Sequence, residues 1–433
     1  MSRTGGILGC ARLSALGVLQ PKSPLAGIKR LSTAEFRPRI CIVGSGPAGF
    51  YTAQHLLKHH KQTQVDIYEK LPVPFGLVRF GVAPDHPEVK NVINTFTQTA
   101  HSDRCSFSGN VTVGRDVTVA ELQKAYHAVV LCYGAEDNRT LGIPGEDLEG
   151  VYTARAFVGW YNGLPENRNL KPDLNSETAV ILGHGNVALD VARILLSPLE
   201  ILRKTDITEE SFSALASSKV KRVYLIGRRG PLQVAFTIKE LREMINLPSV
   251  RPFLDPADFR DLGDAIKDLP RPKKRLTELM IKTALEEPPE EVGGRWASAS
   301  KEWRLKFQRS PLEVLPTMDG KRARAIQLAV NRLEAAGDAV KAVPTGEIEE
   351  LRSGLVFSSI GYKSLPIDPA VPFDSKRGVI PNNSGRVLGA PAVHPVSFSG
   401  WEKIDAVEVT RGKLAGKPRE KIVDQEEMLE LIG

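Results

Sequence analysis

Two short apolar runs along the chain are each followed by a glycine-rich turn and then by a stretch with helical periodicity. The first run, Ile40–Val43, leads into Gly44-Ser45-Gly46-Pro47-Ala48-Gly49 and a helical pattern from Phe50 to Lys58. The second run, Ala179–Leu182, leads into Gly183-His184-Gly185-Asn186-Val187-Ala188 and a helical pattern from Leu189 to Leu196. A buried strand, a tight glycine turn and a helix in this order predict a parallel βαβ unit.

The first turn has the G-x-G-x-x-G spacing of a dinucleotide cradle. Gly44 permits the tight turn, Gly46 lets a pyrophosphate approach the backbone, and Gly49 lets helix and strand pack closely. The start of the helix offers free N–H groups and a positive dipole end to the phosphates. A second strand, Val65–Tyr68, ends in Glu69, 20 residues past Gly49, where a carboxylate meets ribose hydroxyls. These features favour dinucleotide binding over a simple glycine turn.

The second turn predicts a different nucleotide, because its next strand ends differently. Val223–Ile226 is followed by Gly227-Arg228-Arg229-Gly230 rather than by an acid. Two arginines can bind a 2′-phosphate that an acid would repel, which indicates NADP; the alternative is a solvated basic turn. Two cradles with different ends therefore predict two dinucleotides, FAD and NADPH. Hydride then passes from the nicotinamide to the flavin, and these cofactors carry the chemistry.

The order of the remaining apolar runs predicts one domain inserted in another. Val129–Ala135 is expected to close the first sheet and Leu355–Tyr362 the second. We therefore expect an α/β protein with two Rossmann-like, three-layer dinucleotide-binding domains, the NADP domain lying within the FAD domain. The expected bounds are 35–137 and 362–433 for the FAD domain and its tail, and 138–361 for the NADP domain. Leu71–Pro87 and Glu286–Gly294 are expected to be loops.

Charge is concentrated at the N-terminus of the 433-residue chain. Residues 1–34 contain five basic residues and no acid, and they supply five of the seven net positive charges. Their serines and threonines fit a mitochondrial transit peptide, with a disordered basic tail as the alternative. The near-neutral remainder does not indicate nucleic-acid binding. No apolar run is long enough for a membrane span, so any membrane contact is expected to be peripheral.

The spacing of the cysteines argues against two kinds of functional site. The four cysteines form no C-x-x-C pair, which argues against a zinc site and against a dithiol redox centre. No metal is predicted. Cys41 and Cys132 lie in apolar, strand-like runs and are expected to be small buried residues.

Together these features resemble the adrenodoxin reductase family, the mitochondrial ferredoxin–NADP reductases among the glutathione-reductase-like flavoproteins. The resemblance covers nearly all of residues 38–390 and the last forty or so. Its most specific segments are Cys41–Lys58 with Glu69 and Lys70, Val73–Ala100, Ala156–Asn167, Gly185–Leu196 and Gly227–Met244. It implies electron transfer from NADPH through FAD to an acidic [2Fe–2S] ferredoxin, which supports P450 steroid metabolism and iron–sulfur and haem assembly. It also implies a mitochondrial enzyme, in the matrix or peripheral on the inner membrane, and we expect a monomer.

The resemblance also implies roles for individual residues in binding the cofactors, carrying protons and docking the partner. With the turn glycines Gly44, Gly46 and Gly49, the implied FAD contacts are Ala48, Glu69, Leu77 and Val113. With Gly183, the implied NADP contacts are His184, Gly185, Asn186, Val187, Arg228, Arg229 and Glu240. His86 and Asp190 match polar residues near the flavin, as proton carriers or as purely structural hydrogen-bonding groups. Ferredoxin docking is implied at Arg242, Arg271 and Arg275. Basic residues also dominate Lys219–Arg251, which favours an anionic partner over a merely solvated surface.

The sequence departs from the family at two places. His184 stands where the family usually has a polar amide, and a histidine there could add a pH-dependent contact. More seriously, Ala390–Val393 runs directly into the family's C-terminal tail at His394, so a Gly-Trp turn and a Lys-Arg-Gly-Pro-x-Gly helix start are missing. We expect the flavin to lose one wall and the first sheet to lose a covering helix.

The missing segment keeps a second interpretation open. The chain could be a non-catalytic form that binds NADP or ferredoxin without FAD. A related NADPH flavoprotein for another acceptor, such as the small subunit of glutamate synthase, would normally carry cysteine-rich iron–sulfur ligands, which this sequence lacks. A disulfide reductase is disfavoured because there is no C-x-x-C.

Overall fold

The computed structural model describes residues 37–389 except 261, 264, 337 and 338. The expected transit peptide and C-terminal tail lie outside these residues. Within them, no helix combines the length and the apolar character that crossing a bilayer would require.

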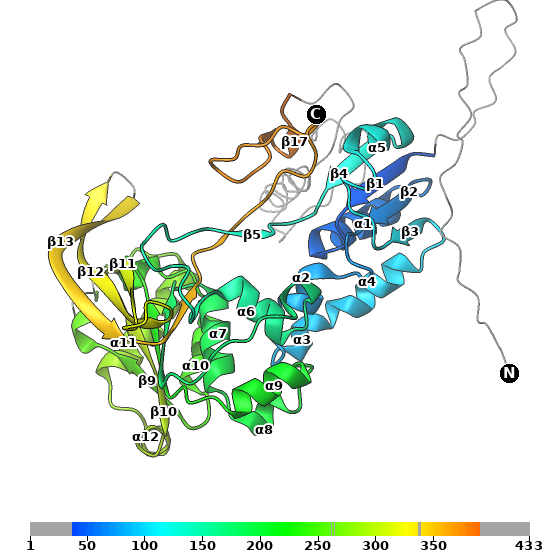
Figure 1. The fold of residues 1–433 in the computed structure, drawn as a ribbon. Coiled ribbons are helices and arrows are strands. Elements are labelled where there is room, and N and C mark those ends of the chain that lie inside the picture. Colours follow the sequence, from blue (N-terminus) through cyan, green and yellow to red (C-terminus); the bar gives the residue numbers. More distant parts are fainter. Residues whose placement is uncertain (1–36, 261, 264, 337–338, 390–433) are drawn as a thin grey trace, which may run out of the picture. The chain divides into compact units, whose positions relative to one another are not determined.

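A four-stranded parallel sheet in the order β3-β2-β1-β4 forms the centre of the first domain (Figure 1). Its strands are β1 (Arg39–Val43), β2 (Gln64–Tyr68), β3 (Cys105–Ser108) and β4 (Ala128–Leu131). The predicted strands at 40–43 and 65–68 are confirmed. Residues 40–43 pair in register with 65–68 on one side and 128–131 on the other. Strand β4 is the last strand of this sheet within the described residues.

Both faces of the first sheet are covered. The apolar residues of α1 (Pro47–His59) and α4 (Val92–Ala100) pack on one face. On the other face, α5 (Val119–Ala125) packs together with Val371 and Val387 from the returning chain. The bare face expected from the missing segment is therefore not seen in the described part of the chain. Cys41 is fully buried here, as expected for a small apolar residue.

The second domain has three layers around a six-stranded parallel sheet in the order β6-β14-β7-β8-β10-β9. Its strands are β6 (Val151–Thr153), β7 (Thr178–Leu182), β8 (Arg222–Ile226), β9 (Val250–Leu254), β10 (Lys301–Lys306) and β14 (Leu355–Ser358). Helices cover one face, and the largest core cluster lies there. These helices are α6 (Ala154–Tyr161), α7 (Asn186–Leu196), α8 (Leu199–Leu202), α9 (Glu209–Ala216), α10 (Ile238–Ile245) and α11 (Arg271–Leu285).

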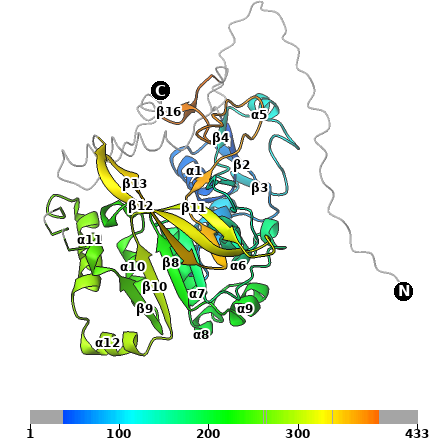
Figure 2. The same ribbon diagram turned by 60° about the vertical axis from the view of Figure 1, so that its left-hand side comes forward.

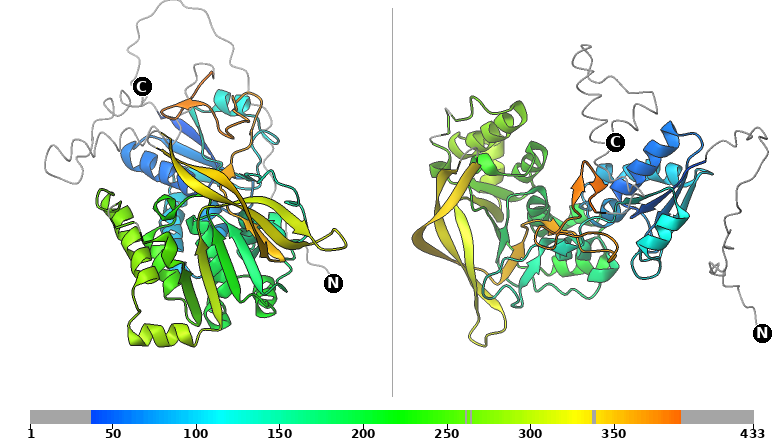
Figure 3. Two further views of the ribbon diagram at one scale, coloured as in Figure 1. Left: turned by 90° about the vertical axis from the view of Figure 1, so that its left-hand side faces the viewer. Right: turned by 90° about the horizontal axis from the view of Figure 1, so that it is seen from above.

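A small antiparallel sheet covers the opposite face of the second parallel sheet. It consists of β11 (Arg309–Pro316), β12 (Ala323–Ala336) and β13 (Ala339–Arg352), in that order. Val314, Ile326 and Leu328 from this sheet pack on Val180 and Val356 of the parallel strands. Figures 2 and 3 show the yellow antiparallel strands crossing the green parallel ones.

The second domain is inserted in the first, as predicted. The outgoing chain forms β5 (Asp137–Asn138) and the returning chain forms β15 (Tyr362–Lys363), and the two pair antiparallel. The returning chain then adds a small hairpin of β16 (Asn382–Asn383) and β17 (Arg386–Val387).

Two segments expected to be loops contain helices. Within Leu71–Pro87 lies α2 (Gly76–Phe80), and α3 (Pro87–Lys90) begins at its end. Within Glu286–Gly294, α12 (Glu290–Ala297) begins after Pro289, with two glutamates in its first turn. Those glutamates suit the positive end of the helix dipole, although the surrounding prolines and glycines are typical of a loop.

Candidate functional site

The first glycine turn has the backbone shape that its spacing predicts. Gly44 has φ of +104°, and a Cβ there would lie 2.5 Å from the Cys132 carbonyl oxygen. A Cβ on Gly49 would lie 2.0 Å from the Gly44 carbonyl oxygen, so helix α1 starts directly against the turn. Gly46 has open space beside it. The turn therefore leaves room for a ligand at the N-terminus of α1, where Ala48 lies in the first turn of the helix.

Glu69 lies at the end of β2 and faces this turn. Its carboxylate accepts hydrogen bonds from the Ser45 backbone N–H at 3.0 Å and the Ser45 hydroxyl at 2.7 Å. A cavity of about 210 Å³ opens beside it, with Gly44, Glu69 and Val113 among its lining residues. Three of the predicted FAD contacts thus meet in one cavity, although they are up to 69 positions apart in the sequence.

Leu77 approaches the same turn from helix α2. The Phe75 N–H donates to the Ser45 carbonyl at 3.0 Å, which holds the start of α2 against the turn. A Cβ on Gly76 would come within 3.1 Å of the Gly46 Cα. Leu77 is nevertheless 66% exposed. An exposed leucine beside an open glycine turn fits a surface that a large planar ligand covers.

The second glycine turn repeats the geometry of the first. Gly183 has φ of +143°, and a Cβ there would lie 2.2 Å from the Ser359 carbonyl oxygen. Gly185 has open space beside it and precedes helix α7. The Asn186 side-chain oxygen accepts a hydrogen bond from the Thr237 N–H at 2.8 Å, which ties the start of α7 to α10. Val187 is half-buried in the first turn of α7.

His184 points away from the open side of this turn. Its Nε2 lies 2.9 Å from the Leu225 carbonyl oxygen, and its ring packs edge-on against Phe307. Burial lowers the pKa of His184 to about 4, so the ring is neutral near pH 7. The expected pH-dependent contact from this ring is therefore wrong, because the ring occupies the core behind the turn. The space it needs comes from Gly227, where a Cβ would meet the ring at 2.2 Å.

Arg228 and Arg229 follow strand β8 with exposed side chains. Their backbone is fixed: the Arg228 carbonyl accepts from the Asn331 side-chain amide at 3.1 Å, and the Arg229 carbonyl accepts from the Gln308 N–H at 3.1 Å. The carboxyl ends of β7 and β8 lie side by side, so the two arginines end the strand next to the glycine turn.

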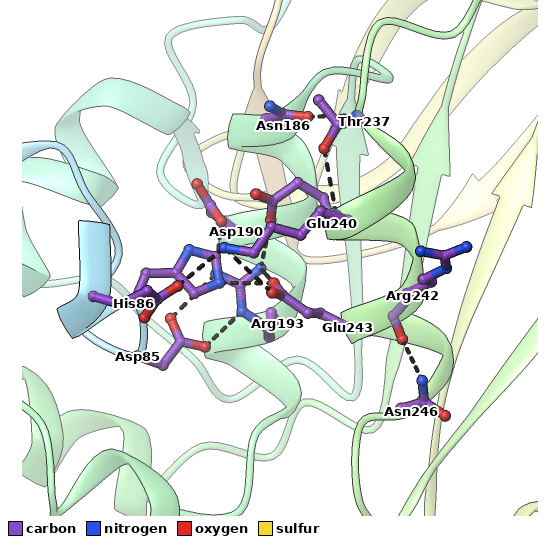
Figure 4. A network of polar contacts seen from close by, with 12 residues as sticks. Asp85, His86, Asn186, Asp190, Arg193, Thr237, Glu240, Arg242, Glu243 and Asn246 are labelled. Carbon is purple, nitrogen blue, oxygen red and sulfur yellow. Dashed lines mark hydrogen bonds and ion pairs between the residues drawn. The ribbon is translucent and has the colours of Figure 1, made fainter. Parts of the chain in front are cut away.

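His86, Asp190 and Glu240 come together in a compact ionic cluster around Arg193 (Figure 4). The Arg193 side chain is 3% exposed and reaches Asp85 at 2.5 Å, Asp190 at 2.6 Å and Glu240 at 3.3 Å. Nε2 of His86 lies 2.7 Å from the Glu243 carboxylate. One ring nitrogen of His86 and one carboxylate oxygen each of Asp190 and Glu240 lie within 4.8 Å of one another. The guanidinium group supplies the positive charge that these carboxylates face.

Burial sets the protonation behaviour of this cluster. It raises the pKa of Asp190 despite the opposing charge of Arg193. It also raises the pKa of Glu240, to which the negative charge of Asp190 adds. Burial alone would lower the pKa of Arg193, but the hydrogen bonds and charges of Asp85 and Asp190 outweigh it and raise that pKa. The cluster can thus hold a proton on a carboxylate while Arg193 stays charged.

The three arginines predicted to dock a partner lie exposed on two helices that pack together. Arg242 is on α10, and Arg271 and Arg275 are in the first two turns of α11. Cations at a helix N-terminus oppose the helix dipole, and the first turn of α11 contains no acid. The helix dipole therefore does not favour these cations, and their exposed positive charge suits binding of an anionic partner.

The structure has two Rossmann-like domains, one inserted in the other, and each carries a dinucleotide cradle. With the ionic cluster between the cradles, this arrangement defines a flavoprotein oxidoreductase that binds two nucleotides. Residues 38–245 match the family described as pyridine nucleotide-disulphide oxidoreductase. Proteins described as mitochondrial NADPH:adrenodoxin oxidoreductase are 59% identical in Mus musculus, covering 98% of both chains, and 61% identical in Homo sapiens, covering 93% of both. A solved structure of Mycobacterium tuberculosis FprA in complex with NADPH is 34% identical, covers 92% of this chain and all of that one, and superposes with a TM-score of 0.77.

The chain belongs to the NADPH:adrenodoxin oxidoreductase family. It is an oxidoreductase whose cofactors are FAD and NADPH. Both cradles fit these groups, since each leaves open space at the middle glycine beside a helix N-terminus.

The comparison also shows that this chain is shorter than the relative it matches. The match to the Mus musculus protein spans 484 aligned positions, more than the 433 residues of this chain, so at least 51 positions face a gap here. The total number of gapped positions is large enough to include the missing segment predicted from the sequence.

Arg193, Asp85 and Glu243 were not predicted as site residues. One signal for Arg193 was present: Asp190 and Arg193 are the only charged residues in the otherwise apolar helix Asn186–Leu196, and a spacing of three places them on one face. Asp85 and Glu243 had no comparable signal, because they meet Arg193 and His86 only through the tertiary fold.

Proposed function

We propose that this chain passes electrons from NADPH through FAD to an acidic [2Fe–2S] ferredoxin in mitochondria. The observation that supports this most directly is the pair of cradles with different second-strand ends, Glu69 at the first and the two arginines at the second. The relatives' names, which include both NADPH and adrenodoxin, support the donor and the acceptor. P450 steroid metabolism and iron–sulfur and haem assembly would be the processes that such a ferredoxin serves.

In this proposal the first cradle holds FAD. Gly44, Gly46, Ala48 and Gly49 receive the pyrophosphate at the start of α1, and Glu69 accepts hydrogen bonds from ribose hydroxyls. Val113 lines the neighbouring cavity. Leu77 lies against the flavin side, where its exposed surface would be covered.

The second cradle holds NADPH. Gly183, Gly185, Asn186 and Val187 surround the pyrophosphate, and His184 contributes through its backbone, because its ring points inward. Arg228 and Arg229 bind the 2′-phosphate. Glu240, which lies on α10 and pairs with Arg193, is the remaining NADP contact of this proposal.

When bound, FAD supplies a carrier that accepts hydride from NADPH and releases electrons one at a time. The chain's own contribution is to orient the nucleotides and to handle protons. His86 and Asp190 carry the proton in this proposal, and burial raises the pKa values of Asp190 and Glu240 above those of ordinary carboxyl groups, which supports a proton-holding role. Arg242, Arg271 and Arg275 attract the acidic ferredoxin to α10 and α11.

The proposed domain bounds are 35–137 with 362–433 for FAD and 138–361 for NADP. Residues 1–34 act as the transit peptide that directs the chain to the mitochondrion. The mature protein works as a monomer in the matrix or at the surface of the inner membrane.

The test begins with the visible spectrum of residues 35–433 after reconstitution with FAD. A flavin spectrum that bleaches when NADPH is added is expected, followed by electron transfer to a [2Fe–2S] ferredoxin. Replacing Arg242, Arg271 and Arg275 together by glutamate should slow the ferredoxin step and leave the bleaching unchanged. A colourless protein that still binds NADP would contradict the proposal and indicate a non-catalytic form without FAD. The loss of FAD would then be explained by the at least 51 aligned positions that this chain lacks.

A further inference from the structure

One short segment of the first domain carries a row of charged and polar side chains that all contact the second domain. The segment is Asp85–Lys90, which leads into and includes helix α3. Its charged partners in the second domain come from three places in that domain. The pairs are Asp85 with Arg193, His86 with Glu243, Glu88 with Lys239, and Lys90 with Asp206.

Each pair is within direct contact distance. Asp85 lies 2.5 Å from Arg193 and His86 lies 2.7 Å from Glu243. Lys90 reaches both oxygens of Asp206 at 2.7 Å, and the Lys90 side chain is only 11% exposed. We call these four pairs the clasp.

The clasp is presented by a stiff piece of chain. Pro84 and Pro87 flank Asp85 and His86, and proline fixes its own φ and restricts the residue before it. The His86 N–H donates to the Ala83 carbonyl at 3.0 Å, which adds a local turn. Such a segment loses little conformational freedom when its charges pair, so more of the pairing energy is retained.

No hydrophobic core cluster of the described residues spans the two domains. Each of the four hydrophobic clusters lies wholly in one domain. Beyond the clasp, the boundary is crossed by the ion pair of Lys70 with Glu166 and by a hydrogen bond from the Asn162 amide to the Phe80 carbonyl. Domains joined by a polar interface are expected to move relative to one another unless specific contacts fix them.

The covalent connection between the domains is also slight. The chain crosses twice, at β5 and β15, which pair over only two residues each. A two-stranded link of this length is too weak to fix an orientation without further contacts.

We infer that the clasp is a positioning device: its three ion pairs and the hydrogen bond between His86 and Glu243 fix the orientation in which the nicotinamide held by one domain meets the flavin held by the other. Lys90 and Asp206 act as positioning residues, since neither belongs to a cradle. The catalytic part of this inference rests on the proposed function. The structural part, that ionic pairing fixes the orientation of the domains, does not.

The test uses charge reversal at the pair of Lys90 and Asp206 in the full chain. Lys90→Glu and Asp206→Lys each place like charges together, and the double variant restores an opposite pair. Hydrogen–deuterium exchange of Asp85–Lys90, without cofactors, should rise at least about fivefold in each single variant. It should return to within about a factor of two of the original chain in the double variant. Lys221→Glu breaks the exposed pair of Lys221 with Glu177 inside the second domain and is the matched control, expected to leave this exchange unchanged.

A second readout links the clasp to hydride transfer. In the FAD-loaded protein, each single reversal should slow flavin bleaching at saturating NADPH and leave NADPH affinity unchanged, and the double variant should recover the rate. Raised salt should increase exchange in the original chain more than in Lys90→Glu, because screening weakens the attraction in the intact pair but weakens the repulsion that the variant introduces.

The outcomes separate this inference from the proposed function. If the original chain shows no bleaching, the proposed function fails, and exchange still decides whether the clasp fixes the domains. Single variants that exchange like Lys221→Glu, or a double variant that stays as open as the singles, would overturn the inference. Restored exchange without a restored bleaching rate would overturn the positioning role.

Discussion

Replacing Arg193 by methionine should destabilise the second domain in a way that depends on pH. The substitution keeps most of the side-chain volume but removes a guanidinium that is 3% exposed and bonded to Asp85, Asp190 and Glu240. Breaking a buried ion pair by removing one partner costs about 3–5 kcal/mol, because the remaining charges stay buried without compensation. We expect a loss of this size near neutral pH.

The sign of the pH dependence follows from the carboxyl pKa values. Those of Asp190 and Glu240 are already raised above their ordinary values in the folded protein, and the opposing charge of Arg193 limits both shifts. Without Arg193 they rise further. A carboxyl group with a raised folded-state pKa binds its proton more tightly when folded, so it costs stability as pH rises through that pKa. The deficit of the variant should therefore be smaller at about pH 5 than at about pH 8, because protonation neutralises the orphaned carboxylates.

Urea unfolding followed by tryptophan fluorescence measures this effect. Trp160 and Trp303 are buried in the second domain and report its unfolding. Arg115→Met removes an exposed arginine paired with Asp116 on the surface and is the matched control, with no measurable change expected. A deficit below about 1 kcal/mol, or an equal deficit at both pH values, would refute the reasoning, because a buried uncompensated charge must respond to protonation.

Three further tests address the cradles. Gly227→Ala should lower the free energy of unfolding of the second domain by about 1–3 kcal/mol, because the new Cβ overlaps the His184 ring. The double variant with His184→Ala should lose less stability than the two single variants combined. Strictly additive losses in urea unfolding would show that the two sites are not in contact. Gly49→Ala should abolish retention of FAD, because its Cβ would overlap the Gly44 carbonyl oxygen, and a flavin spectrum of full intensity after gel filtration would argue against the first cradle. Replacing Arg228 and Arg229 by alanine should cut the preference for NADPH over NADH by about tenfold to a hundredfold, and an unchanged ratio of the two kcat/KM values would remove these side chains from the 2′-phosphate site.

The parts of the fold that follow from local chain chemistry were predictable. Ile40–Val43 and Ala179–Leu182 are apolar runs before glycine turns, and they form the strands β1 and β7. The glycines themselves report backbone positions where a Cβ would overlap neighbouring atoms, as at Gly44 and Gly183. Such requirements are local, so they can be read from one sequence.

The parts that depend on meetings between distant segments were not predictable. The antiparallel sheet β11–β13 covers the second parallel sheet, but its strands carry no signal of the face they would cover. The ionic cluster joins Asp85 to Arg193 across 108 positions. The orientation of the His184 ring depended on the absence of a side chain at Gly227, which no pattern near His184 indicated.

The pairing of β5 with β15 has a consequence for how such a chain can change over evolution. Asn138 faces Tyr362 and Asp137 faces Lys363, so the points where the chain leaves and re-enters the first domain are held side by side. The whole second domain therefore lies between two points of the chain that are adjacent in space. A whole nucleotide-binding module can therefore be exchanged, duplicated or lost at this junction as a single cassette, without rerouting the strands of the host sheet.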